Sequence, residues 1–411
     1  MRKVVITGLG AVCPVGNTID EYLAALKAGR HGFTLEPWFP GQSDELNIKA
    51  KIKNFDPSEY FDKKELRRTD PVTQYAVYAS KKALEDAGTD FSDLDPYKCG
   101  VIIASGIGGI QTTEEQILNY HNKGNGRVSV FTIPMMIGNM APGLVAIKTG
   151  FKGANFTTVS ACASSSHAIG EAFHMIKHGY LDCAIAGGTE ACSIGFSQSG
   201  FNNMHALTRS TNPDRASIPF DKERSGFVLG EGSGIVILEE YEHAVKRGAK
   251  IYAEIAGYGA TCDAYHETSP DPSGEAGAKA MELAVEEAGV SPEIINYCNA
   301  HGTSTKMNDS TETAALKKAF GDQAYRMAVN STKSMTGHLL GAAGGIETVA
   351  VALQMKNDFV HATVGLEVDD EECDLDCCKG SARSMKITGA ISNSLGFGGH
   401  NATLCFLPAD R

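Results

Sequence analysis

Short apolar runs rich in valine and isoleucine recur along the chain, separated by glycine-rich turns and by stretches with helical periodicity. Five of these runs are Val4–Ile6, Val101–Ala104, Ala184–Ala186, Ile235–Leu238 and Ile251–Ile255. Buried strands that alternate with amphipathic helices are typical of an α/β fold, because the helices cover the faces of the sheet. With 411 residues the chain exceeds one ordinary core, so we expect about two domains or one large duplicated body.

The second half of the sequence resembles the first in two places. Val5–Ala11 is similar to Glu254–Ala260, since each places two glycines after an apolar run, and Ala83–Gly88 is similar to Ala284–Gly289. A duplication would give each half a strand, a helix, a strand with catalytic residues and another helix. Chance similarity between glycine-rich α/β turns is the alternative.

A boundary near residue 250 fits a duplication. The charged stretch Glu239–Gly248 is predicted to be a surface helix that ends at its glycine. No low-complexity linker separates the halves. We therefore expect residues 1–250 and 251–411 to form two similar halves that pack into one body.

The cysteines argue against disulfides and metal sites. Eleven is an odd number, and their scattered positions match neither a disulfide framework nor a zinc site. Cys373, Cys377 and Cys378 are close in sequence but lie among acidic residues with no histidine pair nearby. We expect no metal and no other cofactor, and a reducing cytoplasm as the location.

Charge and hydropathy exclude further classes of protein. The first residues, Met1–Gly8, enter a strand pattern directly, with no apolar signal-peptide stretch. No apolar segment approaches the roughly 18 to 20 residues that a membrane span needs. The formal net charge of −12 disfavours nonspecific binding to nucleic acid or anionic lipid. We expect neither as a partner, and any acidic partner must meet a local basic patch.

Cys162 lies between a strand-like run, Asn155–Ser160, and a small-residue helix start, Ala161–Gly170. Unpaired N–H groups and the dipole of a helix start stabilise a thiolate, and a tight strand-to-helix turn is expected to expose the sulfur. This placement is typical of a nucleophile. The alternative is that Cys162 is a small buried hydrophobe, as most free cysteines are.

Two histidines lie in sequence settings that are unusual for packing. His301 follows the apolar segment Ile294–Cys298 and precedes a glycine and two threonines, so we expect it on a loop rather than in a core. His338 lies five residues after Lys333 and before a glycine-rich helix. Each histidine alone could be structural. With Cys162 they suggest a thiol nucleophile flanked by two imidazole donors, which suits thioester acyl transfer.

At these residues the sequence resembles the β-ketoacyl-acyl carrier protein synthases, and among them the elongating type II enzymes of fatty-acid synthesis. The resemblance extends from the first glycine-rich strand to the last glycine-rich loop. Its most specific parts are the Cys162 segment, Pro219–Lys222 with Gly226–Gly232, the His301 loop and Lys333–His338. The resemblance implies a thiolase-like five-layer αβαβα fold of two pseudo-duplicated halves, with the nucleophile in the first half and both histidines in the second. It also implies a homodimer.

In the scheme that the resemblance implies, Cys162 takes an acyl chain from a carrier-protein thioester. Malonyl carrier protein then binds, loses carbon dioxide and attacks the acyl-enzyme, which gives ping-pong kinetics. His301 and His338 would donate hydrogen bonds to the thioester oxygen on which negative charge develops. Lys333 would keep the imidazoles neutral and would pair with an acid.

Further site residues are implied by the resemblance alone. The acids are Glu312 and Glu347, and the backbone N–H groups of Cys162 and Phe397 would form the oxyanion hole, with Phe397 also a gate for the acyl chain. The residues that would contact the pantetheine arm are Thr268, Thr303 and Thr305, and those of the acyl pocket are Ile107 and Phe201. For the threonines the alternative is loop hydrogen bonding, and for the apolar pair ordinary core packing.

An acidic carrier protein needs a cationic docking patch on this acidic chain. Four candidates lie in one predicted helical stretch, and others could join them across the dimer or the fold. The candidates are Lys63, Lys64, Arg67, Arg68, Lys123, Arg127 and Arg209. A solvated charged face is the alternative.

The chain departs from the family pattern at four places. Leu395 stands where a second phenylalanine is common, Lys306-Met307-Asn308 replaces Pro-x-Gly, Ile218 replaces an arginine and Ser225 replaces an aspartate. None of these changes removes a catalytic group. Leu395 could alter the motion of the gate and so the preferred chain length.

The residues of this chain do not match those expected for most other functions. A thiolase would have a second catalytic cysteine in Asn393–Asn401, which contains none. An initiating synthase would pair its cysteine with histidine and asparagine, whereas His338 occupies the second donor position here. A non-catalytic chain-length factor would usually lack the nucleophile, which Cys162 supplies. Gly8-x-Gly10 suggests a dinucleotide fold only weakly, because the sixth motif position is Cys13. A ketosynthase of a polyketide or other specialised pathway stays open.

Overall fold

The computed structural model describes residues 1–38 and 46–409. Ten strands form one large sheet in the order β10-β9-β13-β14-β8-β1-β7-β6-β4-β5. These strands are β1 (Val4–Val12), β4 (Cys99–Ala104), β5 (Asn155–Phe156), β6 (Cys183–Glu190), β7 (Gly232–Glu240), β8 (Ala253–Cys262), β9 (Tyr297–Asn299), β10 (Ala328–Asn330), β13 (Ala390–Gly396) and β14 (His400–Leu407). Two small sheets pair β2 (Thr34–Pro37) with β3 (Leu46–Lys49) and β11 (Phe359–Val360) with β12 (Arg383–Ser384).

The helices lie on both faces of the sheet and between its halves. They are α1 (Ile19–Ala28), α2 (Lys63–Leu66), α3 (Pro71–Ala87), α4 (Ile110–Lys123), α5 (Thr132–Met136), α6 (Met140–Thr149), α7 (Ser164–Lys177), α8 (Gly195–Asn203), α9 (Tyr241–Lys246), α10 (Glu275–Ala288), α11 (Lys306–Phe320), α12 (Lys333–Thr336) and α13 (Ala343–Asn357). None of these helices is long and apolar enough to cross a bilayer, in the part of the chain that the structure describes.

The two halves of the large sheet have the same topology. From the centre outward the strands run β1-β7-β6-β4-β5 on one side and β8-β14-β13-β9-β10 on the other. In both halves the first two pairings are antiparallel and the last two are parallel. The halves join where Val4–Ile6 pairs with Ala253–Ile255. This repetition confirms the expected pseudo-duplicated architecture.

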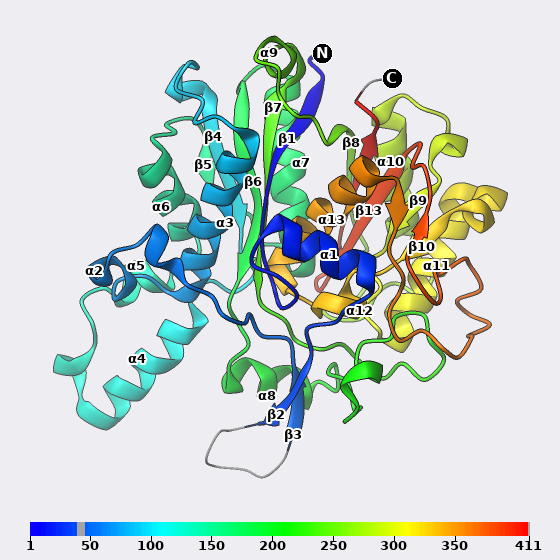
Figure 1. The fold of residues 1–411 in the computed structure, drawn as a ribbon. Helices are drawn as coiled ribbons and strands as arrows, with labels where there is room; N and C mark the ends of the chain where they lie inside the picture. Colours follow the sequence, from blue (N-terminus) through cyan, green and yellow to red (C-terminus); the bar gives the residue numbers. More distant parts are fainter. Residues whose placement is uncertain (39–45, 410–411) are drawn as a thin grey trace.

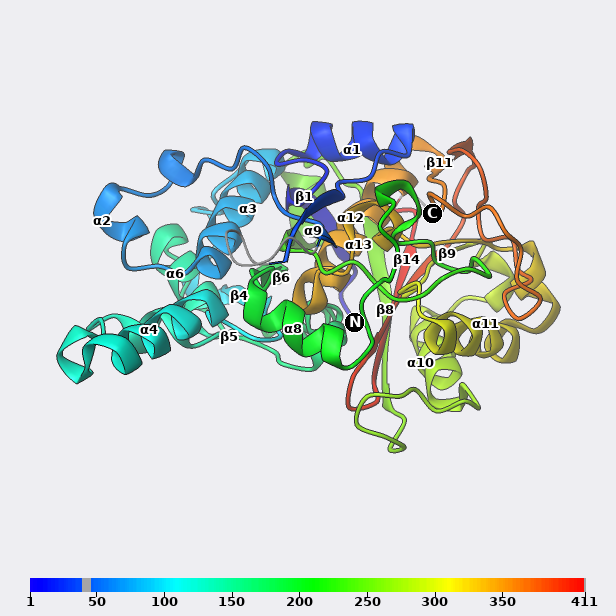
Figure 2. The same cartoon turned by 90° about the horizontal axis from the view of Figure 1, so that it is seen from below.

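Five layers follow from where the helices pack (Figures 1 and 2). Helices α3 and α6 cover the outer face of the first half-sheet, and α10, with α11 packed on it, covers the second. Helices α7 and α13 lie between the half-sheets, since each contacts strands of both. The order is therefore helix, sheet, helix, sheet, helix, as predicted.

The internal sequence similarity has a packing cause. A Cβ atom on Gly8 or Gly10 would lie 2.2 or 1.9 Å from the carbonyl oxygens of Ala83 and Ala79 in α3. In the second half, Gly257 and Gly259 face Ala284 and Ala280 of α10 in the same way, at 2.0 and 1.9 Å. Only glycine allows a helix to approach the strand so closely. The Gly-x-Gly pair is thus a helix contact and not a dinucleotide loop.

Several predicted boundaries differ from the structure. The run Asn155–Ser160 is a strand only over its first two residues, and the strand expected at Ile251 begins at Ala253. Glu239 belongs to β7 and is fully buried, where it pairs with Arg247 (2.8 Å), so the predicted surface helix is confined to α9. The division at residue 250 stays a prediction.

Candidate active site

Cys162 lies in a short 3-10 turn, Ala161–Ala163, that leads directly into α7. Ala161 has a left-handed backbone (φ 50°), which costs a non-glycine residue about 1–3 kcal/mol and occurs where the surrounding structure fixes a turn. The Ser164 hydroxyl fixes this turn, because it accepts from the Ser160 N–H (2.8 Å) and donates to the Ala161 carbonyl (2.7 Å). The strand-to-helix turn is therefore present as predicted.

The sulfur itself is not in the open, contrary to our expectation. Cys162 is only 7% exposed and lies at a pocket wall. Burial raises the pKa of its thiol to about 11, although Lys333 and the Phe397 backbone N–H act in the opposite direction. Desolvation disfavours the thiolate more than these groups stabilise it. The resting form is thus the thiol, and the predicted thiolate is not the resting state.

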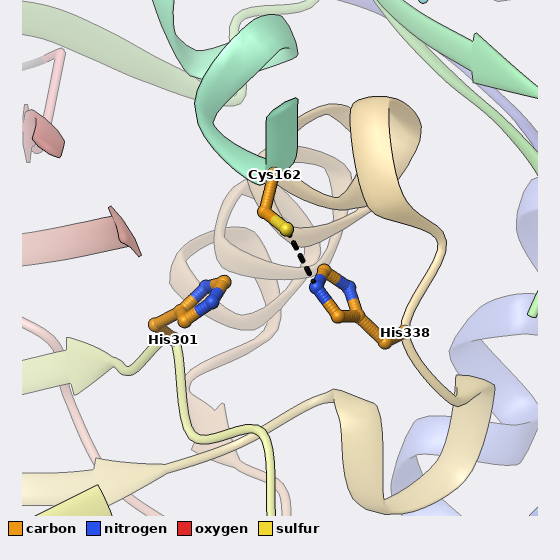
Figure 3. Close-up of side chains that lie close together, drawn as sticks. All are labelled: Cys162, His301 and His338. Atoms are coloured by element: carbon orange, nitrogen blue, oxygen red, sulfur yellow. Dashed lines mark hydrogen bonds between the residues drawn. The ribbon is translucent and has the colours of Figure 1, made fainter. Parts of the chain in front are cut away.

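His338 donates to the nucleophile (Figure 3). Its Nε2 lies 3.0 Å from the Cys162 sulfur. Its Nδ1 accepts a hydrogen bond from the Leu340 N–H (3.3 Å), and its backbone N–H donates to the Val228 carbonyl (2.8 Å). A neutral imidazole that accepts at Nδ1 must hold its proton at Nε2. The backbone thus makes Nε2 a donor toward the sulfur.

His301 follows β9 and faces the same space. Its ring centroid lies 5.4 Å from that of His338, and its Nδ1 lies 3.3 Å from the Lys333 ammonium. An ammonium can only donate, so Nδ1 accepts and Nε2 holds the proton. His301 is on a loop as predicted, but it is 2% exposed, so the expectation that it lies outside a core was wrong.

Lys333 links His301 to a buried acid. Its ammonium donates to the His301 carbonyl (2.6 Å) and to Glu347 (2.5 Å), and both ion-pair partners are 1% exposed. Glu312 has a different role, because it accepts from the N–H groups of His301 and Gly302, each at 2.8 Å. Of the two acids that the resemblance implied, Glu347 pairs with the lysine and Glu312 fixes the His301 loop.

Burial and a nearby cation keep both imidazoles neutral. Desolvation lowers the pKa of His301 well below its usual range, and Lys333 and His338 lower it further. Desolvation and Lys333 have the same effect on the pKa of His338. Burial acts oppositely on Glu312 and raises its pKa to about 7. Two neutral N–H donors therefore face the sulfur at physiological pH.

Phe397 approaches Cys162 through its backbone, as the resemblance implied. It follows directly on β13, and its backbone N–H lowers the pKa of the Cys162 thiol. A Cβ on Gly396 would lie 2.9 Å from the Ser160 carbonyl oxygen and 3.2 Å from the Cys162 nitrogen. Glycine at this position therefore lets the Phe397 N–H come next to that of Cys162.

A cavity of about 640 Å³ opens from Cys162, His301 and His338 to the surface. Thr268, Thr303, Thr305, Phe201, Leu395 and Phe397 line it. Ile107 does not line it and is 41% exposed, so the single chain does not place this residue in the acyl pocket.

Glu190 is a site residue that the sequence analysis missed. It ends β6, is fully buried, and accepts from the N–H groups of Gly106 (2.8 Å) and Gly341 (3.0 Å). It thereby joins the Ile107 turn to the loop after His338. The sequence signal that could have revealed it is an acidic residue at the end of a buried, glycine-rich strand.

Cys162, His301 and His338 also lie close enough to one another to hold a metal ion. Among the described residues, the sulfur and one nitrogen of each imidazole lie within 4.8 Å of one another. Cys373, Cys377 and Cys378 form no such group in the part of the chain described. The expectation that the protein needs no metal stays a prediction.

The candidate docking cations are exposed but do not form one patch. Arg68, just after α2, lies over the ring of Phe131 (4.6 Å), which places the end of α2 beside the segment that contains Arg127. The exposed cations of this region are Lys63, Lys64, Arg67, Arg68, Lys123 and Arg127. Arg209 instead lines the Cys162 cavity.

Comparisons with known proteins agree with this geometry. The family profile "Beta-ketoacyl synthase, N-terminal domain" matches residues 1–244, and "Beta-ketoacyl synthase, C-terminal domain" matches residues 252–367. The chain is 49% identical over 406 residues to "3-oxoacyl-[acyl-carrier-protein] synthase 2" of Synechocystis sp., and 46% identical over 405 residues to the protein of the same name from Staphylococcus aureus. Both alignments cover 98% of each chain.

Solved structures have the same fold over the full length. A β-ketoacyl synthase from Burkholderia phymatum superimposes with a TM-score of 0.91 at 36% identity, covering 100% of both chains. A type II polyketide ketosynthase in complex with its acyl-carrier protein superimposes with a TM-score of 0.93 at 34% identity, again over 100% of both. With the family profiles spanning most of its length and its cysteine and two histidines gathered at one cavity, the chain belongs to the β-ketoacyl synthase family.

Proposed function

We propose that this protein is an elongating β-ketoacyl-acyl carrier protein synthase, which condenses malonyl carrier protein with an acyl chain held on Cys162. The main observation is the pair of neutral Nε2–H donors that face a buried thiol in the cavity. The high identity to 3-oxoacyl-acyl carrier protein synthases over nearly the whole chain supports fatty-acid elongation as the pathway.

Acyl transfer is the first step. The Cys162 sulfur attacks the carbonyl carbon of an acyl carrier thioester, the new C–S bond forms, and the bond to the carrier sulfur breaks. The thiol proton of Cys162 ends on the released carrier thiol. The oxyanion of the intermediate lies where the N–H groups of Cys162 and Phe397 can donate to it, and such a donor contributes about 3–4 kcal/mol.

Decarboxylative condensation is the second step. The malonyl thioester loses carbon dioxide, and the electron pair of that bond becomes an enolate. Nε2–H groups of His301 and His338 stabilise the enolate oxygen, and Lys333 fixes the tautomer of His301. The enolate carbon attacks the acyl-Cys162 carbonyl, a C–C bond forms, and the thioester bond to the enzyme breaks; the Cys162 thiolate that leaves takes a proton from solvent and returns to the thiol. Neither step consumes water. Burial of Cys162 limits the access of water and so disfavours hydrolysis of the acyl-Cys162 thioester.

A polyketide or other specialised ketosynthase is the second candidate. A type II polyketide ketosynthase matches the fold at 34% identity, whereas the fatty-acid enzymes match at 46–49%. A chain-length factor without catalysis is disfavoured by the intact Cys162, His301 and His338 geometry. The test is product analysis: acyl and malonyl carrier proteins together should yield one β-ketoacyl carrier product and one carbon dioxide per turnover.

The carrier protein is the partner that this chemistry requires, and the cations of α2 and of the two residues after it are its proposed docking patch. Reversing Lys64, Arg67 and Arg68 to glutamate is expected to raise KM for carrier-bound substrate about tenfold or more, because attraction of opposite charges becomes repulsion. KM for a small acyl thioester should not change. Lys246→Glu, on exposed α9, is the matched control. Equal losses with both substrates would count against docking.

A homodimer is proposed from an apolar arm that projects from the first half (Figure 1). On α4, on α5 and in the segment between them, several large apolar side chains are more than half exposed. They are Ile117, Leu118, Tyr120, Val130 and Ile133. Several exposed apolar side chains on one projecting arm are typical of an interaction site, and a second copy of this chain would bury them. A cytoplasmic location is proposed because all eleven cysteines are free.

Disrupting the arm should produce monomers. Ile117→Asp with Ile133→Asp would place two charges in the proposed interface, so we expect light scattering to give half the native mass. Val245→Asp, which adds a charge at a half-exposed position on α9, should leave the mass unchanged. A dimer that persists in the double variant would place the interface elsewhere.

A further inference from the structure

Glu190 is a fully buried acid that none of the proposed reaction steps uses. Its carboxylate accepts four hydrogen bonds, and all of these partners are neutral. They are the Ser105 hydroxyl (3.1 Å) and the N–H groups of Gly106 (2.8 Å), Ile107 (3.3 Å) and Gly341 (3.0 Å). A buried carboxylate that is held by neutral donors alone is costly to form, and such groups cluster at functional sites.

The contact with Gly341 is built into the packing. A Cβ atom on Gly341 would lie 2.2 Å from the Gly106 nitrogen and 2.7 Å from the Glu190 carboxylate. A Cβ atom on Gly106 would lie 2.8 Å from the same carboxylate oxygen. Glycine at both positions therefore lets two backbone segments meet one acid. Ser165, in the first turn of α7, donates its hydroxyl to the Gly341 carbonyl, so Gly341 is held on both sides.

The Gly341 contact reaches His338 through one residue, Leu340. The N–H that Glu190 accepts belongs to the peptide plane between Leu340 and Gly341, so the carboxylate fixes the backbone torsions of Leu340. Leu340 is left-handed (φ 45°), which a non-glycine residue keeps only where its surroundings impose it. The N–H of Leu340 in turn donates to His338 Nδ1 (3.3 Å), and this contact leaves the imidazole proton on Nε2, toward the Cys162 sulfur.

We propose that Glu190 is a positioning residue for His338: through the Gly341 N–H it holds the Leu340 N–H on Nδ1 and so keeps the Nε2 proton aimed at the reacting oxygen. Glu190 lies outside the lining of the cavity in the described chain, so it acts through the backbone and not on the substrate. The inference rests on the proposed function for its effect on turnover. The tautomer of His338, however, is a property of the resting enzyme and is measured without turnover.

The substitution Glu190→Gln tests this role. It keeps the shape of the side chain but replaces one acceptor oxygen with an NH2 group that meets N–H donors. In ¹⁵N spectra of enzyme with labelled histidine, assigned by the signal that His338→Asn removes, we expect the single Nε2–H form of the native protein to become a mixture of both tautomers.

Turnover should change in kcat and not in KM. For decarboxylation of a small malonyl thioester, which does not depend on the docking patch, kcat of Glu190→Gln should fall about tenfold. This is less than the 10²- to 10³-fold expected when a donor is removed outright, because the correct tautomer stays populated. KM should change by less than about twofold, since the His338 donor acts on charge that develops in the transition state.

Two further variants separate positioning from folding. Asp70→Asn is the matched control, because Asp70 is another fully buried acid that accepts backbone N–H groups, those of Val72 (3.0 Å) and Thr112 (2.9 Å). It should keep the native tautomer of His338 and the native kcat, whatever its effect on thermal unfolding. Ser165→Ala removes the other contact that holds Gly341 and should shift the tautomer as Glu190→Gln does, so the test does not depend on one variant that folds.

Three results would overturn the inference. The first is a Glu190→Gln enzyme in which His338 keeps the single Nε2–H form. The second is a tautomer that changes without a fall in kcat, and the third is an equal change in Asp70→Asn, which would indicate a general effect of losing a buried carboxylate. A native enzyme that has the expected tautomer but does not decarboxylate the malonyl thioester would contradict the proposed function and leave the positioning of His338 by Glu190 intact.

Discussion

Replacing Cys162 with alanine should abolish condensation while sparing decarboxylation of malonyl carrier protein. Without the sulfur no acyl-enzyme forms, so the rate of product formation should fall at least about 10³-fold. The enolate donors His301 and His338 are untouched, and each keeps the backbone or lysine contact that fixes its tautomer. Release of carbon dioxide from malonyl carrier protein should therefore stay within about tenfold of the native rate.

The measurement is parallel assay of β-ketoacyl product and of carbon dioxide. Cys262→Ala is the matched control, because Cys262 is exposed and does not line the cavity. It should retain both activities. If Cys162→Ala lost decarboxylation as fully as condensation, the sulfur would have a direct role in the second reaction, and the two histidines would not suffice for it.

Replacing Lys333 should lower both the free energy of unfolding and the rate of decarboxylation, for separate reasons. Lys333→Met leaves Glu347 buried without its cation, which costs about 3–5 kcal/mol of unfolding free energy. It also removes the donor that fixes the proton of His301 on Nε2. Loss of one preorganised donor predicts a fall in decarboxylation of about 10²- to 10³-fold.

A double variant separates the two effects. In Lys333→Met/Glu347→Gln no unpaired carboxylate remains, so most of the unfolding free energy should return while decarboxylation stays low. Because Lys333 lowers the pKa of His301, the pKa of this imidazole should rise in the double variant, and an NMR titration of labelled histidine measures it. Recovery of decarboxylation together with stability would show that Lys333 acts only in folding.

Local patterns in the sequence predicted the fold and the residues of the site well. The Gly-x-Gly pairs marked the two places where a helix packs on a strand, and they led to the duplicated halves. Cys162, His301 and His338 lie together at one cavity, and Lys333 is buried against His301, as the resemblance implied. These predictions succeeded because each depends on residues close in sequence or on a family pattern that spans the chain.

Predictions failed where the answer depended on distant packing. Cys162 was expected to be exposed with a stabilised thiolate, but surrounding apolar side chains such as Phe227 and Leu340 bury it, and desolvation raises its pKa. The partners of Glu312 and Glu347 depend on tertiary packing, since Glu312 of α11 meets the His301 loop and Glu347 of α13 meets Lys333 of α12. The role of Glu190 depends on loops 84 and 151 residues away in sequence, Gly106 and Gly341. Side-chain charge and short spacing do not determine these contacts.

The most direct test of the central claim is intact mass spectrometry of the native enzyme mixed with acyl carrier proteins of graded chain length. We expect one acyl adduct per chain, mapped by peptide analysis to Cys162, that disappears when malonyl carrier protein is added and reappears as β-ketoacyl carrier product. The chain lengths that form the adduct would also define the preference of the gate at Leu395 and Phe397. An adduct on another cysteine, or one on Cys162 that malonyl carrier protein does not remove, would contradict the account.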